Sequence, residues 1–180
     1  MNDPDNILID HARNGDLTAA TQLIQRHYAR IYAYHRRQSA NDHDAADLTQ
    51  RTFSKAWEGL DRGDSIKDFT SWLYGIAYHI YVDWVRQSTR QSQRETRWWE
   101  IQPDESSPFH ELEEQDMATH IFALVDRLEE RLRQPIQLHY YQHLTLAQTA
   151  EVLGTSIGTV KNRLREGRQQ LQKETAALNP

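Results

Sequence analysis

The stretch from Thr145 to Gln172 decides the fold, and it reads TLAQTAEVLGTSIGTVKNRLREGRQQLQ. Apolar residues recur at helical spacing in two short segments, which Gly154 separates. The side-chain oxygens of Thr145 and Ser156 can each cap a helix, and Gly154 suits the positive φ angle that often follows a helix end. The pattern predicts two helices joined by a tight turn.

The second of these helices carries a basic surface. Apolar residues at spacings of three, four and seven predict one buried face, made of Ile157, Val160, Leu164 and Leu171. Between positions 156 and 173 there are five basic residues and one acidic residue. In a helix-turn-helix motif the second helix enters the major groove, where Arg and Lys reach phosphates and guanine edges and Asn can read adenine. An ordinary helical hairpin with a solvated basic face is the alternative.

Composition limits the classes of protein to which the chain can belong. There is no cysteine, so disulfides and cysteine-ligated zinc are excluded. No apolar run approaches the ~18 residues of a membrane span, and the N-terminus lacks the basic and then apolar pattern of a secretory signal. We therefore expect a cytoplasmic protein without membrane insertion.

Charge is distributed unevenly along the chain. The net charge is −5, from 21 basic and 26 acidic residues. Residues 100–130 contain ten acidic residues against one basic residue, whereas residues 86–97 and 156–173 carry net positive charge. The overall balance argues mildly against nucleic-acid binding, but the distribution leaves two separate basic stretches that could contact it.

Helical periodicity dominates the whole chain, and strand patterns are nearly absent. Residues 91–110 are polar, contain Pro103 and Pro108, and are typical of a linker. The periodicity predicts helices over 7–13, 17–37, 42–60, 67–90, 111–132 and 135–141, with Asp42 or Asp44 as a cap and Pro135 in a first turn. We predict an all-α protein with two small helical domains, an N-terminal helical bundle (1–97) and a C-terminal helix-turn-helix bundle (115–180), joined by a flexible acidic linker (98–114).

Three stretches together resemble a known family. LEERLRQPIQLHYYQHLTLAQTAEVLGTSIGTVKNRLREGRQQLQ is similar to the promoter-binding C-terminal region of bacterial RNA polymerase sigma factors, most of all the small extracytoplasmic-function (group 4) type. NDHDAADLTQRTFSKAWEGLDR resembles the segment by which that family grips the polymerase clamp. FTSWLYGIAYHIYVDWVRQSTR resembles its promoter-melting helix.

The resemblance implies a role for each of these stretches and assigns residues to it. For the −35 promoter element these are Ser156, Thr159, Lys161, Asn162, Arg163, Arg165 and Arg168. For the −10 element they are Asp61, Arg62, Ser65, Trp72, His79, Arg86 and Arg90. For polymerase binding they are Asp47, Gln50, Arg51, Ser54 and Glu58. The chain departs from the family pattern at Arg51, where Glu is usual, at His79, where Asn is usual, and at Glu166, where a basic residue is usual.

The same resemblance implies the partners: the clamp and flap regions of core RNA polymerase, promoter DNA and an anti-sigma factor. A helix-turn-helix repressor or activator outside the polymerase holoenzyme is the alternative, although it would not need the clamp and melting segments. A third alternative is a pure protein-interaction module that inhibits transcription, and the basic helix argues against it. His43 and Asp44 could suggest a metal-dependent enzyme, but no second ligand motif accompanies them, so we predict no enzyme activity, no metal and no cofactor.

Overall fold

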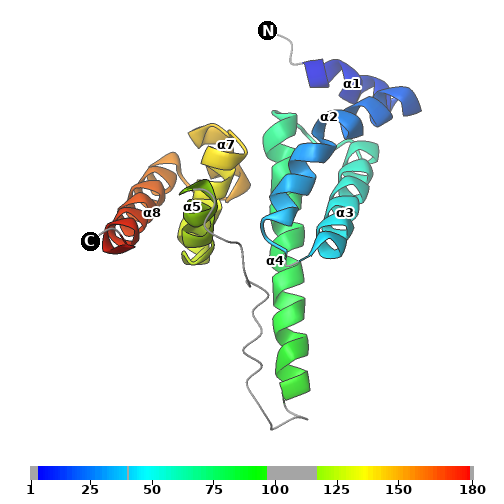
Figure 1. The fold of residues 1–180 in the computed structure, drawn as a ribbon. Coiled ribbons are helices and arrows are strands. Elements are labelled where there is room, and N and C mark those ends of the chain that lie inside the picture. The colour runs from blue at the N-terminus through cyan, green and yellow to red at the C-terminus, as the bar shows by residue number, and fades with distance from the viewer. Residues whose placement is uncertain (1–3, 40, 97–116, 179–180) are drawn as a thin grey trace. The chain divides into compact units, whose positions relative to one another are not determined.

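The computed structural model describes residues 4–39, 41–96 and 117–178, and every regular element within these ranges is a helix (Figure 1). The chain divides into two compact units, Met1–Pro103 and Asp104–Pro180. The all-α prediction is confirmed. The predicted linker, residues 98–114, lies outside the described residues.

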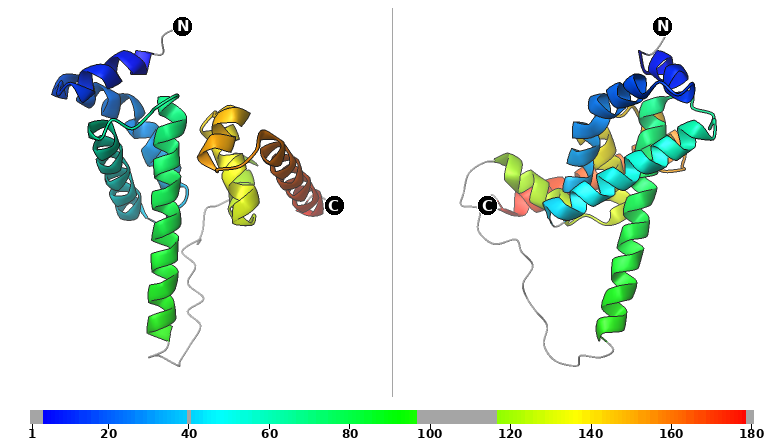
Figure 2. Two further views of the ribbon diagram at one scale, coloured as in Figure 1. Left: turned by 180° about the vertical axis from the view of Figure 1, so that it is seen from behind. Right: turned by 90° about the vertical axis from the view of Figure 1, so that its right-hand side faces the viewer.

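Four helices make up unit 1. They are α1 (Pro4–Arg13), α2 (Leu17–Arg36), α3 (Asp42–Asp61) and α4 (Phe69–Thr96). The helix α2 packs against α1, α3 and α4, and α3 also packs against α4. Figure 2 shows that α4 runs far beyond the ends of α2 and α3. It continues past Arg90 to Thr96, so residues 91–96 of the polar stretch 91–110 are helical.

Local hydrogen bonds define where the helices of unit 1 begin. Asp16 caps α2, accepting from the amides of Thr18 at 2.9 Å and Ala19 at 3.2 Å, and these bonds lower the pKa of its carboxyl. Asn41 caps α3 by accepting from the amide of Asp44 at 2.8 Å. The prediction of Asp42 or Asp44 as this cap was wrong. Both lie in the first turn instead, where their charge is favourable to the helix dipole.

The core of unit 1 contains aromatic and ionisable side chains. Tyr34 and Tyr74 meet edge to face with ring centroids 5.6 Å apart. The His35 ring is fully buried, with Nε2 2.9 Å from Oγ1 of Thr52. The Thr52 hydroxyl donates its own hydrogen to the Leu48 carbonyl at 2.7 Å, so His35 Nε2–H is the donor in the bond between them. Burial and the charge of Arg51 lower the pKa of His35 to about 4.

Polar contacts attach α1 to the rest of unit 1. The buried carboxylate of Asp5 accepts from the Arg26 guanidinium and lies 2.8 Å from His27 Nε2, both on α2. At the other end of α1, Arg13 donates to the carbonyl of Asp64 in the α3–α4 loop. The first helix is therefore anchored both to α2 and to the loop that precedes α4.

Unit 2 contains α5 (Met117–Asp126), α6 (Glu130–Ile136), the π-helical turn η1 (Gln137–Tyr141), α7 (Leu146–Val152) and α8 (Ile157–Leu178). The single helix predicted over 111–132 is wrong, because the chain breaks at residues 127–129 between α5 and α6. Arg133 stabilises this break by donating to the Asp126 carbonyl at 2.9 Å. Pro135 lies inside α6 and not in a first turn, and the helix widens into η1 directly after Ile136.

An aliphatic core holds unit 2 together. Its buried members are Val125, Leu128, Leu132, Ile136, Ala150, Val160 and Leu164. Gly167 lets α6 and α8 cross closely, since a Cβ there would lie 2.7 Å from Ile136 Cδ1. Val160 and Leu164 are buried and Leu171 packs against the core, so three of the four residues of the predicted apolar face of α8 are confirmed. Ile157 was placed on that face wrongly: it is 45% exposed, because it stands in the first turn beyond the end of the core.

Candidate DNA and polymerase interfaces

The helix-turn-helix is built from local signals. Thr145 accepts from the Gln148 amide at 3.2 Å, and the Gln148 side chain accepts from the Thr145 amide at 2.9 Å, which completes a capping box for α7. Gly154 follows with a φ of +57°. Ser156 then accepts from the amide of Thr159 at 3.1 Å and begins α8. The caps at Thr145 and Ser156 and the positive φ of Gly154 were predicted, because these signals are local in the sequence, whereas the reciprocal bond from Gln148 was not.

The described side chains of α8 form one buried side and one exposed side. Val160 and Leu164 are buried, which fixes the rotation of the helix. Lys161, Asn162 and Arg165 are exposed, as the assignment to the −35 element requires. The other assigned residues lie around them: Ser156 and Arg168 are exposed, whereas Thr159 and Arg163 are half-buried. Ser156 is occupied as the cap of the helix.

Glu166 has an intramolecular partner that explains its departure from the family pattern. Both of its carboxylate oxygens accept from the guanidinium of Arg131 on α6, at 2.9 and 2.6 Å. This two-point contact holds the pKa of Glu166 below its usual range. Arg131 also bonds Glu129 at 2.8 Å. The carboxylate therefore ties α8 to α6 at the position where the family pattern has a basic residue.

The residues assigned to the −10 element lie along the α3–α4 connection and α4. Asp61, Arg62 and Ser65 are exposed, and Gly63 turns the chain with a φ of +76°. The half-buried ring of Trp72 lies across Gly59, where a Cβ would be only 2.7 Å from Trp72 Cζ2. His79 and Arg86 are exposed on α4, whereas the Arg90 side chain lies outside the described residues.

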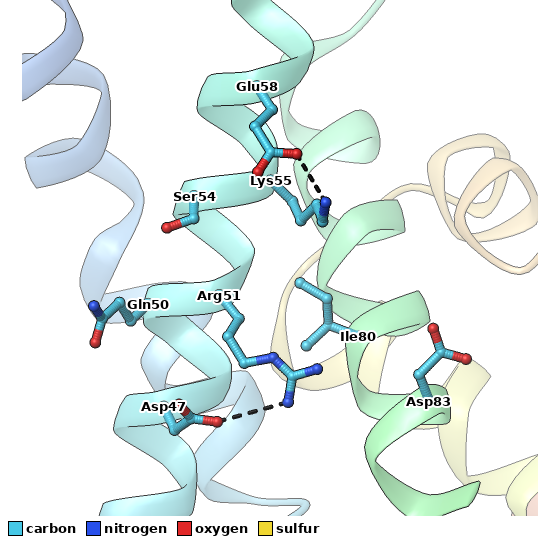
Figure 3. Close-up of a pocket in the computed structure, with 8 residues that line it drawn as sticks. All are labelled: Asp47, Gln50, Arg51, Ser54, Lys55, Glu58, Ile80 and Asp83. Carbon is cyan, nitrogen blue, oxygen red and sulfur yellow. Dashed lines mark hydrogen bonds and ion pairs between the residues drawn. The ribbon is translucent and has the colours of Figure 1, made fainter. Parts of the chain in front are cut away.

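The residues assigned to polymerase binding line one groove between α3 and α4. Asp47, Gln50, Arg51, Ser54 and Glu58 surround it together with Lys55, Ile80 and Asp83, and its volume is about 310 Å³. Figure 3 shows Arg51 and Lys55 extending toward α4, while Gln50 and Ser54 point away from it. Sequence reasoning missed Ile80 and Asp83, because their position beside α3 depends on how α4 packs.

Ion pairs within α3 set the charge pattern of this groove. Lys55 pairs with Glu58 at 2.8 Å, which lowers the pKa of the Glu58 carboxyl. Arg51 lies 3.6 Å from Asp47, one turn earlier on the helix. The groove thus presents Asp47, Glu58 and Asp83 against Arg51 and Lys55, three acidic groups against two basic groups. Arg51 reverses the sign at one position of a surface that stays acidic overall.

A second groove, on unit 2, was also missed. It has a volume of about 500 Å³ and is mainly apolar. Its lining comes from α5 and the C-terminal half of α8: Ile121, Arg168, Leu171, Gln172, Thr175 and Ala176. The side chain of Ile121 is 42% exposed. Apolar surface of this kind is typical of a protein contact, which distinguishes it from the basic surface of the same helix.

Metal and membrane signals were also sought. Within residues 4–39, 41–96 and 117–178, no group of three or more His, Asp or Glu side chains could hold a metal ion. None of the helices in the described part of the chain is long and apolar enough to cross a bilayer.

Comparison with known proteins agrees with this arrangement. Residues 23–91 match Sigma-70 region 2, and residues 121–171 match Sigma-70 region 4. The RNA polymerase sigma factor NccH of Alcaligenes xylosoxydans xylosoxydans is 30% identical, with 95% of each chain covered. The ECF RNA polymerase sigma factor SigW of Bacillus subtilis is 27% identical, covering 94% of this chain and 96% of SigW.

A solved structure supports the fold. It is the sigma factor RpoE of Bartonella quintana in complex with the anti-sigma factor NepR. The TM-score is 0.66 at 24% identity, covering 85% of this chain and 94% of the other. All-helical structure in two units is therefore shared with a known sigma factor.

The chain is a promoter-recognition subunit of bacterial RNA polymerase and belongs to the sigma-70 family. Within that family it is an extracytoplasmic-function (ECF) sigma factor. Such proteins direct transcription initiation and are not enzymes. The matches to both sigma-70 regions also argue against the alternative of a free-standing repressor, because a helix-turn-helix repressor would account for region 4 only.

Proposed function

We propose that the two units divide promoter recognition between them. Residues 1–97 bind the polymerase clamp and the −10 element, residues 115–180 bind the −35 element and the flap, and residues 98–114 link the two. The protein acts in the cytoplasm, in response to an environmental or envelope signal. The −35 assignment rests mainly on α8, where Val160 and Leu164 are buried while Lys161, Asn162 and Arg165 are exposed.

Base reading by α8 is tested with promoter duplexes selected from a random pool by the wild-type holoenzyme. Lys161→Ala and Arg165→Ala should each lower the preference for selected over scrambled duplex, by roughly 1–3 kcal/mol for a residue that contacts a base edge. Lys173→Ala is the matched control, because it removes an exposed positive charge from the same helix farther from its first turns. If both variants bind both duplexes as tightly as wild type does, the −35 assignment is refuted.

Polymerase docking is assigned to the α3–α4 groove. The double change Asp47→Lys, Gln50→Lys adds positive charge to two exposed positions without opening a core cavity, so folding should survive. Affinity for core polymerase should fall, because hydrogen bonds and charge complementarity are lost. Asn6→Lys, Asp10→Lys makes the same charge change at exposed positions of α1 and serves as the control. Unchanged affinity of a folded Asp47/Gln50 variant would exclude this groove from the interface.

The apolar groove between α5 and α8 is assigned to the flap. Lys161, Asn162 and Arg165 do not line it, and Arg168 is the one residue that the groove shares with the −35 set, so one unit can hold DNA and polymerase together. Ile121→Glu places a charge at its exposed rim and should weaken transcription from promoters that need the −35 element. Unit 2 should still fold, since Ile121 is 42% exposed. Normal transcription by this variant would remove the groove from the contact.

An anti-sigma protein is the proposed regulator. The Bartonella quintana sigma factor of similar fold was solved with an anti-sigma factor bound. In this chain the same two grooves offer surfaces for which such a regulator and core polymerase would compete. We expect the anti-sigma protein to inhibit transcription, and we expect added core polymerase to relieve this inhibition in proportion to its concentration. Inhibition that does not depend on polymerase concentration would contradict competition.

A further inference from the structure

Two helical glycines of this protein are required by its fold. A Cβ at Gly59 would lie 2.7 Å from Trp72 Cζ2, and a Cβ at Gly167 would lie 2.7 Å from Ile136 Cδ1. At both positions a neighbouring helix packs against the glycine. Glycine lowers helix stability relative to alanine, and the close helix contacts account for its presence at these two positions.

Gly158 has no such reason within the structure. It is exposed, and it does not have the positive φ angle found at Gly15, Gly63 and Gly154. Apart from its two chain neighbours and the nearby backbone of α8, the closest atom of the described residues to a Cβ at this position would be Oγ of the helix cap Ser156, at 3.7 Å, which is an ordinary contact. The folded chain would therefore accept a side chain at Gly158 without strain and would gain helix stability from it.

The position of Gly158 on α8 indicates what needs the missing side chain. Lys161, Asn162 and Arg165 follow it by three, four and seven residues, and these spacings place all four residues on one face of a helix. Gly158 is thus part of the exposed face that carries the assigned base readers, one turn closer to the start of the helix. N-terminal residues of a recognition helix contact base edges in helix-turn-helix proteins.

We propose that Gly158 lets the backbone of α8 approach promoter DNA closely enough for Lys161, Asn162 and Arg165 to reach base edges. The major groove is about 12 Å wide, and a helix with its side chains is about 10–12 Å across, so the fit leaves little room. A side chain at the point of closest approach pushes the whole helix outward. This positioning role rests on the proposed −35 function of α8.

The test uses the full chain in reconstituted holoenzyme and the selected promoter duplex described above. Gly158→Ala should raise the Tm of unit 2 by about 2–6 °C and still weaken duplex binding roughly tenfold. Gly158→Leu should fold equally well and weaken binding further, because its side chain is larger. Gly75→Ala, on α4, is the control: apart from the chain neighbours and the nearby backbone of α4, no atom of the described residues would lie within 4 Å of a Cβ there. It should leave the −35 contribution unchanged.

The outcomes separate this inference from the function on which it rests. Wild-type binding by both Gly158 variants, with binding weakened by Lys161→Ala and Arg165→Ala, overturns the inference alone. If neither of the latter two variants weakens binding, the proposed −35 function fails as well. Equal losses for Ala and Leu would show that helix flexibility matters and not close approach. A lower Tm for Gly158→Ala would show that the fold itself requires the glycine.

Discussion

Unit 1 and unit 2 are both helical bundles, but their cores are chemically different. Unit 1 buries His27, His35 and Tyr74, and hydrogen bonds to these side chains lie between its helices. In unit 2 no ionisable side chain is buried among the residues described, and aliphatic residues fill the core around Gly167. The stability of unit 1 should therefore respond to pH, whereas that of unit 2 should respond mainly to changes of volume.

The positions of the tryptophans allow the unfolding of the two units to be measured separately in the intact chain. Trp57 lies on α3, and Trp72 and Trp84 lie on α4, all in unit 1, whereas Trp98 and Trp99 fall in the predicted linker; residues 104–180 contain no tryptophan. With Trp98 and Trp99 replaced by Phe in every variant, tryptophan fluorescence follows the unfolding of unit 1 alone, while far-UV circular dichroism follows the helices of both units.

The largest effect is expected in unit 2 for Gly167→Leu. The side chain would overlap Ile136, whose Cδ1 would be 2.7 Å from the new Cβ, and would force α6 away from α8. We expect a loss of more than about 3 kcal/mol, at or above the upper end of typical overpacking costs. Circular dichroism should show one transition at lower denaturant, with the fluorescence transition unchanged. Gly158→Leu, nine residues earlier on the opposite side of α8, is the matched control, and equal destabilisation by both would refute the packing argument.

Acid should destabilise unit 1 through His35, whose pKa is about 4 in the folded protein and 6.5 in the unfolded chain. The stability that depends on a neutral His35 is fully present above about pH 6.5. It is lost as the pH falls toward 4, because the unfolded chain binds a proton that the native state excludes; the loss is up to about 3 kcal/mol. His35→Gln keeps a donor for Thr52 without a titrating ring. Its urea midpoint, followed by fluorescence, should vary less between pH 7.5 and 4.5. An identical pH profile for wild type and variant would contradict this prediction.

Loss of the α7 capping box should have an intermediate effect. Thr145→Ala leaves the amide of Gln148 without its side-chain acceptor and should cost about 1 kcal/mol in unit 2. Thr175→Ala, which removes an exposed hydroxyl that bonds a carbonyl within α8, is the control and should cost less. Urea unfolding followed by circular dichroism gives both values. A Thr145 variant as stable as the control variant would show that the cap is unimportant.

The smallest effect is expected for the Arg131–Glu166 pair. Both side chains are about half exposed, so solvent and salt screen their attraction. A double-mutant cycle with Arg131→Gln and Glu166→Gln should give a small favourable coupling that falls as salt is added. No coupling at low salt would mean that the two-point contact between α6 and α8 does not contribute to stability.

Much of the helix-turn-helix could be predicted from the sequence because its signals are local. Thr145, Gly154 and Ser156 act on backbone groups within three residues of themselves, so their roles follow from chain order. The periodicity of α3 and α8 likewise identified the exposed residues Gln50, Lys161 and Asn162. Where several residues of the same capping type stand close together, as Asn41, Asp42 and Asp44 do at the start of α3, the sequence did not identify the cap.

Contacts between residues far apart in the sequence were decided only by the tertiary structure. Glu166 meets Arg131 across 35 positions. Ile80 and Asp83 complete the α3–α4 groove because α4 packs against α3. Ile157 has the spacing of a core residue but is exposed in the first turn of α8. Periodicity specifies which side of a helix is apolar. How far that side is covered depends on the length and crossing of its neighbours, which only the packed chain determines.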